Sequence, residues 1–552
     1  MRPSSGLSLL VSAASLLAVG TLGAPWFPIA GRFGGGGHQL FQTSDACMAC
    51  HNGLVTPSGE DVSIGSTWRA TIMANSARDP YWQASVRREV LDHPGVRSEI
   101  EDECSKCHMP MMRRQAHADG ERGEVLSRLP LGRSQEPLDL LAADGVSCTV
   151  CHQIMPDKLG LPESFVGGFV IDSTTPFGQR VVFGPFEVDA GRQRIMHSSS
   201  EFQATTGLHI RESSLCATCH TLFTEARDSS GKVIGRLPEQ VPFLEWQASD
   251  YATEGNSQSC QSCHMPVVTD SVAISSVWGM PRKGLARHEF RGGNFLMLRM
   301  LSRYRTELAV DALPSELELA ARRTVDHLAN ETARMTLQGV RLDRAEGRLL
   351  ADVVIRNLTG HKLPTGYPSR RAWLHVVVRD RSDRIVFESG SLAANGSIVG
   401  NDNDADATKF EPHYRDVHSS EEVQIYESIM ADAKGLPTTG LLSAVRFVKD
   451  NRLLPLGFVK KGASQDIAVQ GTAMEDGDFG EGSDRVRYAV SVTPGDAPFR
   501  VQAELLFQPI AYRWARNLST VPASEAQRFV SYYEAMSAGS ATQLGVDSAT
   551  VR

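Results

Sequence analysis

The chain has 552 residues, of which 41% are hydrophobic and 22% are charged. This balance is typical of globular proteins and excludes a wholly disordered chain. The formal net charge is −8 and no basic run stands out, so we expect no nucleic-acid partner. Past the N-terminus, no apolar stretch reaches about 18 residues, which excludes a polytopic membrane protein.

Residues 1–30 predict a secretory signal peptide or an N-terminal anchor. Arg2 precedes a charge-free stretch whose apolar part runs from Leu7 to about Leu22 and ends in small residues. Both interpretations predict that the rest of the chain is exported. An uncleaved anchor would add membrane association through the N-terminus.

All ten cysteines fall in five Cys-x-x-Cys-His units. The units are Cys47-Cys50-His51, Cys104-Cys107-His108, Cys148-Cys151-His152, Cys216-Cys219-His220 and Cys260-Cys263-His264. This is the spacing of c-type haem attachment: two thiols bond to the porphyrin and the adjacent histidine binds its iron. A zinc site usually combines two Cys-x-x-Cys pairs, so five pairs would leave one pair without a site. A thioredoxin-like redox pair does not require the histidine that follows every pair here. We therefore predict five covalent haem c groups with these histidines as proximal ligands, and no structural disulfide.

The motifs crowd into residues 47–264, too little chain for five separate globular domains. Residues 38–300 are therefore predicted to form one pentahaem domain of helices and long loops, with porphyrin as much of its core. Asp79-Pro80 predicts a helix that begins at Pro80 and runs to about Leu91.

The sequence contains an internal repeat within this domain. Trp68-Arg69-Ala70-Thr71 separates the first two motifs, and Trp246-Gln247-Ala248-Ser249 separates the last two. The second and fifth motifs are both followed by Met-Pro. The pattern indicates a duplicated two-haem unit.

The pattern changes beyond the motifs. Residues 301–337 are predicted to be a helical connector, opened by a capping box of Ser315 and Glu318. Residues 338–510 are predicted to form a β-sandwich-like domain because short alternating runs recur there. Its expected strands include 350–355, 373–378, 385–387, 423–426, 488–492 and 499–507. Residues 511–552 are predicted to be a C-terminal helix, about Ser524 to Met536, and a tail. The fold class is thus α+β and multidomain.

The opposite side of each iron decides whether a haem only carries electrons or can bind a substrate. Eleven histidines lie outside the motifs, enough to supply five distal ligands. The distal candidates in loop-like contexts are His93, His197, His288 and His361, with Met73 as a thioether candidate. His327 and His375 are interpreted as structural. If His361 binds iron, it clamps the β domain to the haem domain.

At these motifs the sequence resembles multihaem c-type cytochromes with the tetrahaem nitrifier-type domain, a superfamily that includes pentahaem nitrite reductase and hydroxylamine oxidoreductase. The resemblance rests on the attachment motifs, the Trp68 segment, His288 to Asn294 and Gly360 to Gly366. It implies electron transfer in the periplasm or at the outer surface of a bacterium. Where that pattern often has a histidine after the Trp segments, this chain has Met73 and Tyr251. No Cys-x-x-Cys-Lys occurs, which argues against the nitrite reductase.

The leading hypothesis is an exported pentahaem cytochrome c that relays electrons between redox partners, such as other cytochromes or quinol-linked complexes. Whether it is an enzyme is left open: one alternative is an oxidoreductase acting on a small nitrogen or sulfur compound at one open haem. Another is a subunit of an extracellular haem filament. The oxygen-rich run Asn401–Asp406 suggests a Ca²⁺ site, although a solvated loop is favoured.

Overall fold

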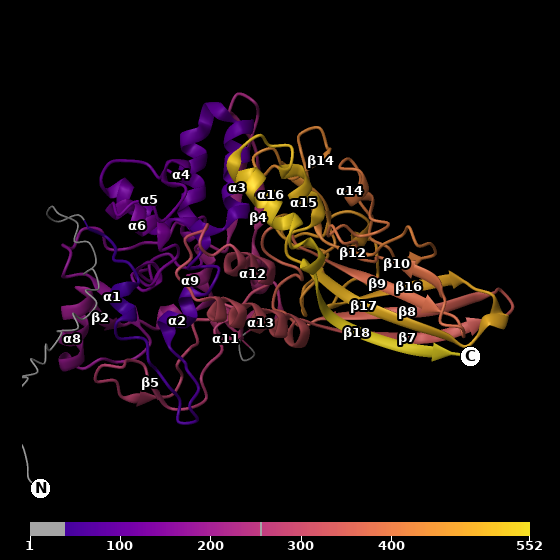
Figure 1. Ribbon diagram of the computed structural model, residues 1–552, viewed down its shortest axis with the longest axis horizontal. Helices are drawn as coiled ribbons and strands as arrows, with labels where there is room; N and C mark the ends of the chain where they lie inside the picture. Colours follow the sequence, from indigo (N-terminus) through magenta and orange to yellow (C-terminus); the bar gives the residue numbers. More distant parts are fainter. Residues whose placement is uncertain (1–38, 254–256) are drawn as a thin grey trace, which may run out of the picture.

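The computed structural model describes residues 39–253 and 257–552 (Figure 1). The predicted signal peptide or anchor, residues 1–30, lies outside the described residues. The molecule is elongated, with helices and loops at one end and a strand-rich body at the other (Figure 1). No helix in the described part is long and apolar enough to cross a membrane. The predicted α+β class is confirmed.

The N-terminal half consists of short helices joined by long loops. Its helices are α1 Asp45–Met48, α2 Ile64–Arg69, α3 Pro80–Asp92, α4 Arg97–His108, α5 Pro110–Ala118, α6 Pro137–Ala143, α7 Cys148–Cys151, α8 Ala190–Ser200, α9 Ser213–Ala217, α10 Pro242–Gln247 and α11 Cys260–His264. Its two-stranded sheets pair β1 Val181–Gly184 with β2 Gln203–Thr206, β3 Leu222–Arg227 with β4 Val233–Gln240, and β5 Val272–Ala273 with β6 Pro281–Arg282. The predicted start of α3 is confirmed, since the Asp79 carboxylate accepts hydrogen bonds from the backbone of Tyr81 and Trp82.

The two copies of the sequence repeat adopt the same local structure. Trp68 is the next-to-last residue of helix α2, and Trp246 is the next-to-last residue of helix α10. Three residues later, the hydroxyl groups of Thr71 and Ser249 each donate a 2.7 Å hydrogen bond back to the carbonyl of that tryptophan. The hydroxyl replaces a backbone donor at the helix end, which explains why Ser or Thr recurs at this position.

Two helices connect the halves, α12 Phe295–Arg303 and α13 Pro314–Glu331. The predicted capping box is wrong by two residues. Proline occupies the first position of α13, and the Glu316 side chain accepts a 2.9 Å hydrogen bond from the backbone N–H of Leu313. One face of α13 is buried and consists of Leu317, Ala321, Thr324 and Leu328.

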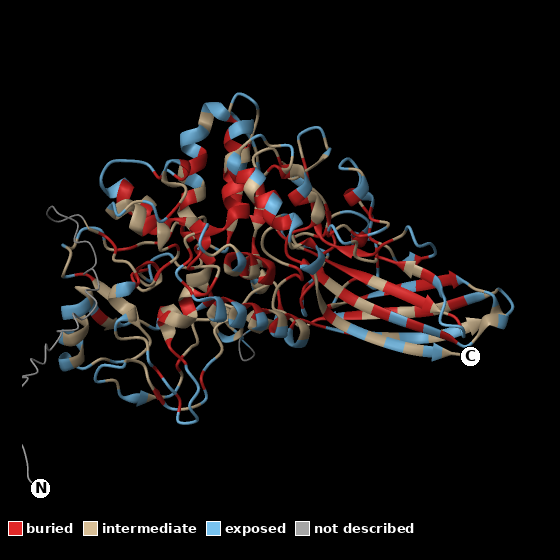
Figure 2. Cartoon of the chain, viewed as in Figure 1, coloured by how far each residue is buried: buried red, intermediate tan, exposed pale blue. Residues whose placement is uncertain are grey.

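Two antiparallel sheets form the C-terminal body. One has the order β10 (Ile385–Ser389), β9 (Arg371–Arg379), β17 (Phe499–Gln508), β18 (Thr542–Val551), with β12 (Ile425–Tyr426) also on β9. The other has the order β11 (Asp416–Val417), β16 (Ser483–Ser491), β8 (Arg348–Asn357), β7 (Ala333–Asp343), where only the short β11–β16 pairing is parallel. Their facing sides form a continuous apolar core, and outward positions of β17 and β18 are exposed (Figure 2).

Strands β7 and β18 are missing from the sequence prediction. β7 begins at Ala333, inside the predicted connector, and β18 occupies most of the predicted tail. In β18 only Leu544 is fully buried, because the strand closes an edge of its sheet. A strand with so little apolar surface gives a weak alternating signal.

The two halves are held together at several points. The last helix, α16 Ser524–Glu534, packs beside α3 of the N-terminal half (Figure 1). There Arg87 of α3 forms a two-point ion pair with Glu525 of α16. A small sheet of β13 Ser428–Ala431, β14 Pro437–Thr438 and β15 Arg446–Asp450 leads to Leu441, whose backbone N–H donates a 2.8 Å hydrogen bond to the buried Glu89 of α3. These contacts hold the two halves in place on either side of one cavity.

Candidate haem-binding site

Each Cys-x-x-Cys-His motif lies on or at the end of a short helix. The helices are α1, α4, α7, α9 and α11. Residues three and four positions apart share one face of a helix, so both thiols and the imidazole of each motif point to the same side. None of the ten thiols forms a disulfide. The local fold therefore presents each motif in the form that covalent haem attachment requires.

A single continuous cavity brings all five motifs together. Every cysteine and histidine of the motifs lines it, although they come from segments spread over residues 47–264. The remaining lining is mostly apolar and includes residues of α13 and of the turn after β8. Several porphyrins in one shared cavity are what this lining fits, and the observation agrees with the prediction of a core made largely of cofactor.

The imidazoles predicted to be proximal ligands are oriented by backbone carbonyls. The Nδ1 atoms of four of them lie at hydrogen-bonding distance from a carbonyl oxygen: His51 from Ile274, His108 from Ser76, His152 from Phe183 and His264 from Arg291. When Nδ1–H donates to a carbonyl, Nε2 is unprotonated and its lone pair is free to bind a metal. Metal-binding histidines usually have this arrangement. The ring of His220 forms no hydrogen bond with the described residues.

Two pairs of histidines face each other across the cavity. The ring centres of His152 and His288 are 6.4 Å apart with an angle of 18° between planes, and those of His264 and His361 are 6.3 Å apart with an angle of 16°. Two imidazoles that bind one metal ion from opposite sides, each through a bond of about 2.0–2.1 Å, have ring centres roughly 6 Å apart. The spacing therefore fits one iron between the members of each pair.

The predicted distal ligands of both pairs also lie at hydrogen-bonding distance from backbone carbonyls. His288 Nδ1 lies 3.0 Å from the carbonyl oxygen of Ala286, and His361 Nδ1 lies 2.9 Å from that of Lys362. Burial lowers the pKa of both imidazoles to about 4. They are thus uncharged at neutral pH, which is the form that binds iron.

The other predicted distal ligands are placed differently. Met73 lines the cavity. His93 is buried at the end of α3, but it does not line the cavity and its ring nitrogens meet no hydrogen-bond partner among the described residues. His197 lies on α8 and also does not line the cavity; its Nε2 is 2.7 Å from the carbonyl oxygen of Gly178. The cavity lining thus includes His288, His361 and Met73 and does not include His93 or His197.

Two further residues of the cavity lining were not singled out by the sequence as functional. His327, interpreted as structural, lies on α13 with its ring centre 6.1 Å from that of His264, and the two planes meet at 65°. Arg370 has no acidic partner among the described residues, and its Nη1 donates to the carbonyl of Thr365 at 2.8 Å. Burial lowers the pKa of Arg370 to about 10. A guanidinium that lines the cavity without a carboxylate partner fits an anion such as a haem propionate. By contrast, His375 lies on β9 between Glu388 and Glu504, as a structural histidine should.

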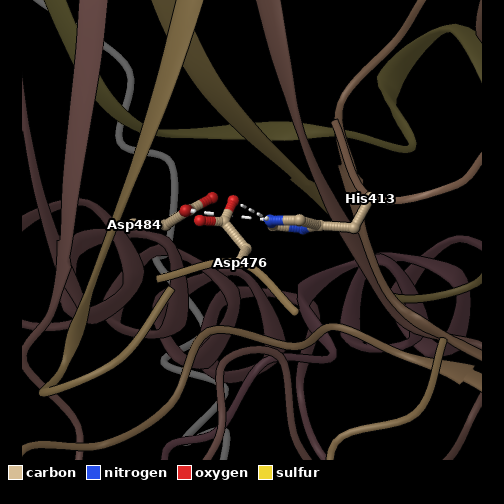
Figure 3. A group of neighbouring side chains, drawn as sticks. All are labelled: His413, Asp476 and Asp484. Atoms are coloured by element: carbon tan, nitrogen blue, oxygen red, sulfur yellow. Dashed lines mark hydrogen bonds and ion pairs between the residues drawn. The ribbon is translucent and has the colours of Figure 1, made fainter. Parts of the chain in front are cut away.

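A separate buried group in the sandwich half consists of His413, Asp476 and Asp484 (Figure 3). His413 Nε2 lies 3.2 Å from Asp476 Oδ2 and 3.8 Å from Asp484 Oδ1. Side chains of these types at this spacing can hold a metal ion. The hydrogen bonds on the other side of the imidazole decide against it.

The Nδ1 atom of His413 accepts hydrogen bonds from two amide groups, Gln424 at 2.9 Å and Asn451 at 3.1 Å. Both amides are fixed in orientation, because their oxygens accept from the backbone N–H groups of Tyr414 and Glu427. Nδ1 is therefore unprotonated, and Nε2 carries the proton that it donates to the Asp476 carboxylate. The group is a satisfied hydrogen-bond network.

The oxygen-rich run Asn401–Asp406 has a structural role. It contains the short helix α14, Asp402–Ala405, and both Asp404 oxygens bind the guanidinium of the buried Arg371 at 2.9 Å. Asn401 Oδ1 caps the backbone N–H of Asn403. These contacts use oxygens that Ca²⁺ would need, so the geometry gives the calcium prediction no support.

Comparison with known proteins places the fold. The sequence matches no family model and no curated protein. Among solved structures, the chain is similar to a penta-heme cytochrome c552 from Thermochromatium tepidum, with 16% sequence identity and a TM-score of 0.53. The match covers 93% of this chain and 100% of that one. The chain therefore shares the fold of a multihaem cytochrome c.

Proposed function

We propose that the chain is an exported multihaem cytochrome c that binds five haems covalently and relays electrons between redox partners. The observation that carries this proposal is the shared cavity: all five Cys-x-x-Cys-His motifs line it, and two of their histidines face a second histidine at the spacing of a six-coordinate iron. The similarity to a penta-heme cytochrome supports it.

When bound, the haems supply reversible one-electron chemistry at iron. The chain's own residues hold and tune them. The ten thiols fix the porphyrins, the carbonyl-bonded Nδ1 atoms keep the proximal rings in one orientation, and the apolar lining excludes water. Arg370 offsets negative charge inside the cavity. His288 and His361 would fill the sixth positions of the irons at the third and fifth motifs, which would favour electron transfer over substrate binding there.

Export follows from the predicted N-terminal signal and from the chemistry of haem c, and it suits a periplasmic or surface location. Redox partners would be other cytochromes or quinol-linked complexes. Assembly into a haem filament is tested by the size of the purified protein in solution. A monomer at micromolar concentration contradicts the filament.

The first experiment is a haem stain and mass measurement of the purified holoprotein, followed by EPR of its oxidised form. A mass gain of five haems with every iron low-spin supports the relay. Fewer than five haems contradicts the proposal.

A specific observation favours a second candidate, catalysis at one open haem. Apart from the five proximal ligands, only His288, His327 and His361 line the cavity among the described histidines. Neither His51, His108 nor His220 faces a second described histidine at ligand spacing. A high-spin iron whose EPR signal changes with nitrite, hydroxylamine or sulfite would assign that haem as an active site and overturn the pure relay.

A further inference from the structure

The contacts between motifs define which haems are neighbours. A motif thiol bonds at the edge of its porphyrin, so thiols that lie close together in this fold bring two porphyrin edges near each other. Three pairs of thiols from different motifs lie close enough to influence each other's ionisation: Cys47 with Cys148, Cys107 with Cys219, and Cys216 with Cys260. Both thiols of the fourth motif take part, each toward a different motif.

The link between the fourth and fifth motifs also rests on hydrogen bonds. The backbone N–H of Cys260 donates to Ser213 Oγ at 3.1 Å, and the Gln261 side chain donates to the carbonyl of Glu212 at 2.8 Å. Helices α9 and α11 are thus joined directly. The two predicted proximal imidazoles, His220 and His264, are close enough for their charges to interact.

The link between the second and fourth motifs passes through Gly167. Its N–H donates a 2.7 Å hydrogen bond to the carbonyl of Thr218, inside the fourth motif. On its other side it packs on Lys106, inside the second motif, so closely that an added Cβ would lie 3.1 Å from the Lys106 Cβ. With φ at +71°, glycine is the residue that this position favours. His108 and His220 lie within electrostatic range of each other.

Among the described residues, the first motif has its neighbours in the segment around the third. Thr149 Oγ1 donates a 2.8 Å hydrogen bond to the carbonyl of Gln42, and Ser44 Oγ donates to Asp144 at 2.7 Å. The third motif lies near the fourth. Cys151 and Cys219 are close enough for their charges to interact, and His209, ahead of α9, has its Nε2 2.8 Å from the carbonyl oxygen of Ile154, two residues after His152. No described contact joins the first motif to the second or fifth.

We propose that the haem of the fourth motif is the junction of a branched network. It adjoins the haems of the second, third and fifth motifs, and the haem of the first motif reaches it through the third. The network therefore has three ends, at the first, second and fifth motifs, and an electron that travels between any two ends passes the fourth haem. This inference rests on the proposed function, since it requires five attached haems.

The decisive experiment locates the five irons in crystals of the wild-type holoprotein by anomalous scattering at the iron edge. We expect the iron bound by His220 to have three nearest neighbours and the iron bound by His51 to have one. An unbranched row of five irons overturns the inference and leaves the proposed function intact. Fewer than five irons contradicts the proposed function instead.

A test in solution uses His220→Met with His51→Met as the matched control. Methionine in place of histidine raises the reduction potential of its own haem, so that haem is reduced first. In a potentiometric EPR titration, we expect early reduction of the fourth haem to shift the signals of three other haems, and early reduction of the first haem to shift one. Equal numbers in the two variants would falsify the branched arrangement.

Discussion

His264 of the haem half and His361 of the sandwich half face each other with ring centres 6.3 Å apart and planes 16° from parallel. His361 lies in the turn after β8, and the same turn is anchored to the haem half by Glu245, which accepts hydrogen bonds from Lys362 N–H at 3.1 Å and Thr365 Oγ1 at 2.6 Å. One iron between the two rings would join the halves at the point where their backbones already meet.

Replacing that distal ring should open one iron. In His361→Ala we expect one of the low-spin EPR signals to be replaced by a high-spin signal, because the fifth haem loses its sixth ligand. His375→Ala, a β9 histidine away from the cavity, is the matched control and should keep every signal. His327 is also near His264 and could bind the iron when His361 is absent. The double variant His327→Ala/His361→Ala excludes this replacement. A low-spin spectrum that survives in the double variant contradicts the assignment.

The third motif allows the same test on an independent pair. His288→Ala should open the iron bound by His152, again changing one low-spin signal to high-spin. His197→Ala serves as the comparison, because His197 binds the carbonyl of Gly178 and does not line the cavity. Loss of a low-spin signal in His197→Ala, with none in His288→Ala, would reverse the two roles.

Arg370 should set the potential of the haems nearest to it. It lies within electrostatic range of His220, His264 and His361 and has no acidic partner among the described residues. A nearby positive charge favours the reduced iron, so Arg370→Ala should lower the reduction potential of at least one haem. Arg370→Lys keeps the positive charge and should lower that potential much less. Spectropotentiometric titration measures this. The control is Arg500→Ala, an exposed arginine of β17; an equal shift there would show that the effect is not local.

Much of the site could be predicted from local sequence, and the residues that the prediction missed share one cause. Attachment motifs are fixed by spacing, and His361 and His288 stand in glycine-rich loops that sequence alone identifies. His327 was missed because it lies near Thr324 and Leu328 on a helix whose apolar face predicts packing against side chains, whereas that face borders the cofactor cavity. Whether a buried histidine such as His93 reaches the cavity depends on distant segments, which periodicity does not report.

The stability of the holoprotein should fall between acidic and neutral pH because of Glu239 on β4. Burial raises the pKa of this carboxyl from its ordinary value of 4.5 to about 7. The folded state therefore holds a proton that the unfolded state has released, so stability decreases as the pH rises from about 4.5 to 7. A shift of this size corresponds to roughly 2–4 kcal/mol in the free energy of unfolding.

Glu239→Gln removes this titration. We expect the variant to match the wild type near pH 4.5 and to be more stable above pH 7, because the neutral amide never has to ionise in a buried position. The exposed Glu225→Gln, on the paired strand β3, is the control and should follow the wild-type pH profile. Denaturant midpoints at pH 4.5, 6 and 7.5 give the measurement. A parallel pH dependence in Glu239→Gln and wild type would show that another group causes the decline.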